Sequence, residues 1–166
     1  MWKNLAPYFT GYPTRMKIAQ KMLEYGLRTN NGKVYCGPIE LSDSKMARAF
    51  DVDRRAIAAT IETISSHPEL SKIFDKLQPT CHLKEVAPAM HWGVVEILPE
   101  DPSTPGILAE IATIIAQENI SIRQAISDDF ELTEEPRLYV ITEGTIPAHL
   151  IPKLRHAKGV KAVLIY

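Results

Sequence analysis

From Gly93 to Tyr166 strand-like stretches alternate with stretches of helical hydrophobic spacing. The strand-like stretches are residues 93–98, 120–127, 138–142 and 159–166. After the first of them, apolar residues recur at the spacing of one helix face, at Ile107, Leu108, Ile111, Ile114 and Ile115. A second, shorter helical pattern opens at Pro147. The predicted order of elements is therefore β-α-β-β-α-β.

This order in residues 91–166 is the ferredoxin-like arrangement, in which four strands form one sheet and both helices pack on the same face. The other face of the sheet stays open, so we expect a partner, a ligand or water to cover it. Many unrelated functions use this fold, so the function has to be sought in the loops.

The loop after the first strand narrows the range of functions that this fold can serve. It contains Asp101-Pro102 and then Pro105-Gly106-Ile107-Leu108, and Asn119-Ile120 opens the second strand. With these motifs residues 91–166 resemble an ACT domain, the amino-acid-sensing module of metabolic enzymes and regulators, with Ser103-Thr104 inserted in the loop. The resemblance implies a homodimer or higher homo-oligomer with an effector between subunits. The candidate effector-binding residues are Asp101, Ser103, Thr104, Pro105, Gly106, Ile107, Asn119 and Ser121.

The chemistry of these residues agrees with an amino-acid effector. The loop ends at a helix N-terminus, where free N–H groups attract a carboxylate. Gly106 lets a ligand approach the backbone closely, and Asn119 offers both a donor and an acceptor. Two alternative interpretations remain. Gly106 can serve only as a tight turn and Asn119 only as a helix cap, or the ACT domain can serve only for dimerisation.

The first half has mostly helical patterns, and a proline-containing boundary near Val86–Ala89 divides the chain into domains 1–88 and 89–166. Within it, Ser42 is placed to cap one short helix and Asp53 to cap the next. The second helix carries an apolar stripe at Ile57, Ile61 and Ile64. Two short helices joined by a tight turn predict a helix-turn-helix. Short strands at 34–36 and 39–41 would make this domain winged.

The segment resembles the DNA-binding half of many bacterial and archaeal repressors, with Leu41, Ala47, Val52 and Ile57 at the characteristic positions and Asp51 where glycine is usual. The resemblance implies that the second helix enters the major groove of DNA. The candidate DNA-binding residues are Ser44, Lys45, Arg54, Arg55 and Ala58. The alternative is a solvated face of a protein-docking module.

The charge is divided between the halves. Residues 1–88 hold 13 Lys+Arg and 9 Asp+Glu, a net +4, whereas residues 89–166 hold 6 and 11, a net −5. A basic first half suits a polyanionic partner. Acidic residues around the two short helices, at Asp43, Asp51, Asp53 and Glu62, weaken that field.

The order of the two domains resembles archaeal predicted regulators of amino-acid metabolism. For this α+β chain we therefore expect a ligand-responsive transcription regulator rather than an enzyme. The alternative is a regulatory subunit that dimerises through the ACT domain and docks on a metabolic enzyme. A small free-standing enzyme and RNA binding through the open sheet are further alternatives.

The sequence also lacks the patterns of several other classes of site and protein. We find no catalytic constellation, no spacing of metal ligands and no phosphate-binding glycine loop, so we expect neither a metal nor a cofactor. The acidic stretch 128–135 is expected to be a solvated loop, with a divalent cation as the alternative. No apolar run is long enough for a membrane span, and no signal peptide is evident, so we expect a cytoplasmic protein with reduced Cys36 and Cys81.

Overall fold

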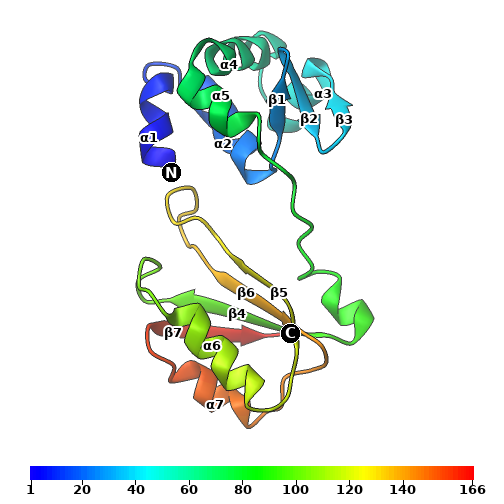
Figure 1. Ribbon diagram of the computed structural model, residues 1–166, viewed down its shortest axis with the longest axis vertical. Coiled ribbons are helices and arrows are strands. Elements are labelled where there is room, and N and C mark those ends of the chain that lie inside the picture. Colours follow the sequence, from blue (N-terminus) through cyan, green and yellow to red (C-terminus); the bar gives the residue numbers. More distant parts are fainter. The chain divides into compact units, whose positions relative to one another are not determined.

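The computed structural model describes residues 1–166, which form two compact units, Met1–Cys81 and His82–Tyr166 (Figure 1). The predicted α+β class is confirmed, with one antiparallel sheet in each unit. No helix has the length and apolar character needed to cross a bilayer.

The first unit combines helices with a three-stranded sheet of order β1-β2-β3. Its elements are α1 (Trp2–Leu5), a 3-10 helix η1 (Ala6–Phe9), α2 (Pro13–Glu24), β1 (Arg28–Asn30), β2 (Lys33–Cys36), β3 (Ile39–Leu41), α3 (Asp43–Phe50), α4 (Arg54–Ser66) and α5 (Pro68–Phe74). The two strands predicted at 34–36 and 39–41 are confirmed, and a further strand, β1, pairs with β2.

Helix α4 is the centre of this unit, because it packs against α2, α3 and α5. The predicted stripe is confirmed: Ile57 and Ile64 are fully buried and Ile61 nearly so. The other large side chains of the unit that are fully buried are Phe9, Ile18, Met22, Leu70 and Phe74. Burial of this stripe fixes which face of α4 is left for solvent.

The second unit contains the six predicted elements in the predicted order, preceded by a 3-10 helix. They are η2 (Ala87–Met90), β4 (Gly93–Pro99), α6 (Ile107–Ala116), β5 (Ile122–Ser127), β6 (Leu138–Thr142), α7 (Leu150–Arg155) and β7 (Val160–Ile165). The sheet is antiparallel with the order β5-β6-β4-β7, so β4 and β6 are central. Figure 1 shows α6 and α7 together on one face of this sheet. Val95 and Ile97 of β4 are buried in the same core as Ile111 of α6 and Leu154 of α7.

The opposite face of the sheet differs from the expectation of an open surface. Val94 and Ile141 on that face are fully buried beneath the chain's own residues 82–92, in a small core with Leu83, Ala87 and Trp92. These residues form the segment that precedes β4. Part of the face is therefore covered within the chain, because the segment carries apolar side chains that bury against the sheet.

The same contacts place the division of the chain earlier than the sequence indicated. Residues 82–88, assigned above to the first domain, belong to the second unit. Leu83 and Ala87 pack on the sheet, and the backbone N–H of Leu83 donates to Oε1 of Gln124 at 2.9 Å. Pro88 therefore occurs in η2, within the second unit, and does not mark the boundary between the units.

Candidate nucleic-acid interface and effector site

The two short helices α3 and α4 are capped where the sequence predicts. Ser42 Oγ accepts a hydrogen bond from the N–H of Lys45 at 3.4 Å, and Asp53 Oδ1 accepts one from the N–H of Arg55 at 2.6 Å. Each bond satisfies a backbone donor that the start of a helix leaves free. The caps fix where α3 and α4 begin, and hence which side chains occupy their first turns.

The turn between these helices accommodates its unusual residue. Asp51, where glycine is usual in the resembling proteins, adopts a left-handed backbone with φ +54°. Aspartate is one of the few non-glycine residues that visit this region. The N–H of Val52 then donates to the carbonyl of Ala47 at 3.0 Å, which closes the C-terminus of α3. The departure at position 51 is thus compatible with a tight helix-turn-helix connection.

The predicted DNA-facing residues are on the surface of these helices. Arg54, Arg55 and Ala58 are exposed on α4, and Ser44 and Lys45 are exposed in the first turn of α3. The guanidinium groups of Arg54 and Arg55 make no hydrogen bond or ion pair within the fold. Two cations without an ion pair therefore lie at the start of a helix whose opposite face is held in the core.

In the second unit, the loop between β4 and α6 folds back on itself. Asp101 Oδ1 accepts hydrogen bonds from the N–H of Ser103 at 2.9 Å and from its hydroxyl at 2.7 Å, and the N–H of Thr104 donates to the carbonyl of Asp101 at 3.0 Å. The bonds from the Ser103 hydroxyl and backbone lower the pKa of Asp101. The carboxylate is thus engaged in shaping the loop.

Gly106 ends this loop as the N-cap of α6. Its φ is +96°, a conformation that side chains rarely adopt, and a Cβ added there would meet no atom within 4 Å. No side chain caps α6, so the N–H groups of its first turn are unsatisfied within the helix. The backbone here is open to a neighbouring acceptor.

A cavity of about 150 Å³ lies beside this turn. Three predicted residues line it: Thr104, Gly106 and Ile107. The other lining residues are Pro99, Pro102, Leu108, Ser127, Pro136, Arg137 and Leu138. The cavity suits a group the size of a small side chain.

The remaining predicted effector residues do not line this cavity. Asp101, Ser103 and Pro105 belong to the loop, whereas Asn119 and Ser121 follow the other end of α6. A helix of ten residues is about 15 Å long. One small ligand therefore does not contact both Gly106 and Asn119 of the same chain. Asn119 itself has φ +56°, and its N–H donates to the carbonyl of Ala116 at 3.0 Å, so it closes the helix.

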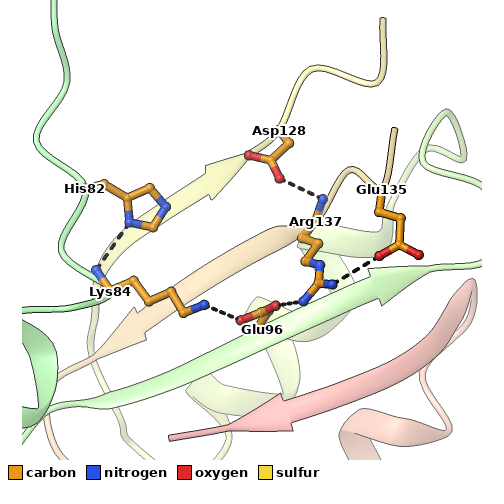
Figure 2. Close-up of polar contacts among 6 residues, drawn as sticks. All are labelled: His82, Lys84, Glu96, Asp128, Glu135 and Arg137. Carbon is orange, nitrogen blue, oxygen red and sulfur yellow. Dashed lines mark hydrogen bonds and ion pairs between the residues drawn. The ribbon is translucent and has the colours of Figure 1, made fainter. Parts of the chain in front are cut away.

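A buried carboxylate lies on the face of the sheet away from α6 and α7. Glu96 of β4 has a side chain only 1% exposed, and its Oε2 lies 2.7 Å from Nζ of Lys84. Its Oε1 accepts from Nη1 of Arg137. Burial raises the pKa of Glu96, but the hydrogen bonds from Lys84 and Arg137 outweigh that effect and lower it below the ordinary value. Figure 2 shows the carboxylate held between the two cations.

The two cations have further contacts, also drawn in Figure 2. Nη2 of Arg137 lies 3.2 Å from Glu135, and the N–H of Arg137 donates to Asp128 at 3.0 Å. The N–H of Lys84 donates to Nδ1 of His82 at 3.3 Å. Since Lys84 belongs to residues 82–92, Glu96 ties that segment to the sheet. Arg137 also belongs to the stretch 136–138 that lines the cavity.

Several residues of these sites were not among the candidate residues predicted from the sequence. The cavity residues at the end of β5 and around the start of β6 become neighbours of the β4–α6 loop only through the pairing of the sheet. Glu96 could have been noticed in the sequence, since it is the only charged residue in the apolar stretch 93–98.

No group of three or more His, Cys, Asp or Glu side chains is arranged to hold a metal ion. Cys36 and Cys81 form no disulfide.

No model of a protein family and no curated protein sequence matches the chain. Among solved structures, the C-terminal domain of the MgtC protein from Mycobacterium tuberculosis has 18% identity and a TM-score of 0.37, over 46% of this chain and 86% of that one. A homoserine dehydrogenase from Thiobacillus denitrificans has 22% identity and a TM-score of 0.36, over 72% of this chain but only 26% of its own. AsnC from E. coli has 12% identity and a TM-score of 0.29, over 93% and 89%. All three TM-scores are below 0.5, so these likenesses carry no information on the function of this chain.

Proposed function

We propose that this protein is a ligand-responsive transcription regulator. Its first unit binds duplex DNA through α3 and α4 as a helix-turn-helix, and its second unit acts as an ACT domain for an amino acid or a related small effector. The observation that carries the proposal is the exposed start of α4. There Arg54 and Arg55 have no partner within the fold, and the small Ala58 allows close approach to a groove.

The effector half of the proposal requires two copies of the chain. Gly106 and Asn119 are at opposite ends of α6, so an effector that contacts both has to lie between subunits. A carboxylate would bind the free N–H groups after Gly106, and an apolar side chain would enter the cavity beside Ile107 and Leu108. Binding would alter the spacing of two helix-turn-helix units and so their fit to half-sites about one helical turn apart.

The DNA-binding half is tested with the purified full-length chain and fluorescent duplexes of mixed sequence. We expect an affinity that falls steeply between 50 and 200 mM salt, on the order expected from counterion release. Arg54→Ala and Arg55→Ala should each weaken binding about tenfold, because a lost contact from arginine to a base or phosphate is worth about 1–3 kcal/mol. Lys72→Ala, an exposed lysine on α5, is the matched control and should change little. Salt-insensitive or absent binding would contradict the proposal and favour a subunit that docks on an enzyme.

The effector half is tested by thermal unfolding in the presence of each of the twenty amino acids. A binder at about one hundred times its Kd should stabilise the folded chain by about 2.7 kcal/mol. Leu108→Gln should reduce that shift, because Leu108 is an exposed residue of the cavity. Leu164→Gln, an exposed leucine of β7 outside the cavity, is the control. If none of the twenty shifts the transition, the second unit serves assembly and not amino-acid sensing.

A further inference from the structure

A second hollow, in the first unit, lies between the start of α2 and the side of α4. Its volume is about 380 Å³. The residues that line it are Gly11, Tyr12, Pro13, Thr14, Arg15, Arg55, Ala56 and Ala59. Helices α2 and α4 pack together, so residues about forty positions apart in the sequence share one surface (Figure 1). Of the DNA-binding residues predicted from the sequence, Arg55 is the one that lines this hollow.

The hollow is positively charged. Two arginines line it and no carboxylate does. Arg55 has no partner within the fold. Arg15 has only neutral partners: its Nη1 donates to Thr63 Oγ1 at 3.2 Å, and its guanidinium lies 4.2 Å from the centre of the Tyr12 ring. These contacts orient the Arg15 side chain while leaving its charge uncompensated.

The shape and the remaining lining residues suit a compact oxyanion. Tyr12 and Thr14 add hydroxyl donors at the exposed rim, and the small side chains of Ala56 and Ala59 leave room above α4. Guanidinium groups match the geometry of phosphate oxygens, so two arginines that line one hollow suit a single phosphate group.

From these observations we infer that the hollow binds a phosphate group of the DNA backbone while the exposed start of α4 faces the bases. This inference rests on the proposed function and adds Arg15, Tyr12 and Thr14 to the interface. Arg55 then lies between the two kinds of contact, since it belongs both to the hollow and to the exposed start of α4. A phosphate contact fixes the register of the protein on the duplex without reading its sequence.

The test measures how the binding constant for duplex DNA varies with salt concentration. Arg15→Gln should lower the slope of log K against log salt by about 0.9, the value for one lost phosphate contact, and should weaken binding evenly across unrelated duplexes. Arg15→Lys keeps the charge and should retain the wild-type slope. Lys17→Gln, an exposed lysine two residues along α2 that does not line the hollow, should also leave the slope unchanged.

The outcomes separate this inference from the proposed function. If the wild-type chain binds DNA and Arg15→Gln leaves the slope at the wild-type value, the phosphate site is wrong while the regulator proposal stands. If the wild-type chain binds no duplex, both are wrong. The alternative ligand is a free phosphate compound. It is tested by titration with inorganic phosphate, monitored through the amide resonances of Thr14 and Arg15. Saturable shifts that Arg15→Gln abolishes, in a chain that binds no DNA, would assign the hollow to a free phosphate compound and overturn the DNA assignment.

Discussion

Substitution of Gly26 by alanine is expected to destabilise the first unit by about 2–5 kcal/mol, because two costs combine at this position. Gly26 follows α2 with φ +61°, where a side chain is strained. A Cβ at this position would also lie 2.2 Å from the carbonyl oxygen of Gln78 and 2.5 Å from its carbon. Since those are backbone atoms, no side-chain rotation relieves the overlap. Residues 78–81 would have to move away from the end of α2.

The control for Gly26→Ala is Gly32→Ala. Gly32 has φ +73°, so alanine meets a similar backbone strain, but nothing lies within 4 Å of its Cβ position. The control should lose only about 1–2 kcal/mol. Urea unfolding followed by Trp2 fluorescence, in a Trp92→Phe background, reports the first unit alone, because Trp2 is buried there. Equal losses for the two variants would show that contact with Gln78 does not contribute.

The elements that the sequence predicted well are those with a strong local pattern. The stripe at Ile57, Ile61 and Ile64 and the caps at Ser42 and Asp53 define α4 and the start of α3 with no knowledge of distant contacts. The β-α-β-β-α-β order follows similarly, because strand-like compositions and stretches of helical spacing alternate after residue 93. In α4 the pattern and the burial agree, since the apolar stripe is buried while Arg54, Arg55 and Glu62 are exposed.

The elements that the sequence did not predict depend on pairing or burial from outside the segment. Strand β1 is a polar stretch, Arg28–Asn30, and becomes a strand because Lys33–Tyr35 pairs with it. Helices α1 and η1 are each four residues long, and the burial of Trp2, Leu5 and Phe9 stabilises them. Short elements of this kind have almost no helical cooperativity of their own.

The candidate sites show the same contrast. The loop 101–107 and the exposed residues of α4 are contiguous, so their motifs were visible in the sequence. The sequence does not show that Arg15 and Arg55 line the same hollow, because this arises from the packing of α2 on α4. The position of residues 82–92 on the sheet was also hidden, since proline-containing composition resembled that of a linker. Local chemistry was predictable, whereas the residues brought together by tertiary packing required the structure.

The buried carboxylate of Glu96 leads to a prediction about acid stability. At neutral pH, Glu96→Gln should destabilise the second unit by about 1–3 kcal/mol, because Lys84 and Arg137 lose their charged acceptor. The pKa of Glu96 is lowered in the folded chain, so the ionised carboxylate stabilises the fold above its unfolded pKa of about 4.3. That stabilisation is lost as the pH falls through the lowered folded value. The difference between wild type and Glu96→Gln should therefore shrink below about pH 4.

The matched control is Glu143→Gln. Glu143 pairs with Arg123 at 2.8 Å, but both side chains are exposed, so solvent screens the pair and little stability should be lost at any pH. Unfolding is followed by Trp92 fluorescence in a Trp2→Phe background, which reports the second unit.

Hydrogen exchange at the amide of Leu83 gives a local readout of the same substitution. This amide donates to Gln124, and Leu83 is one residue from Lys84. If Glu96 holds residues 82–92 on the sheet, Glu96→Gln should accelerate exchange there far more than at Val140 in the buried centre of β6. A uniform acceleration would show instead that Glu96 contributes to global stability without any special role in fastening this segment. Unchanged exchange together with unchanged acid stability would mean that the cost of burying the carboxylate cancels its ion pairs.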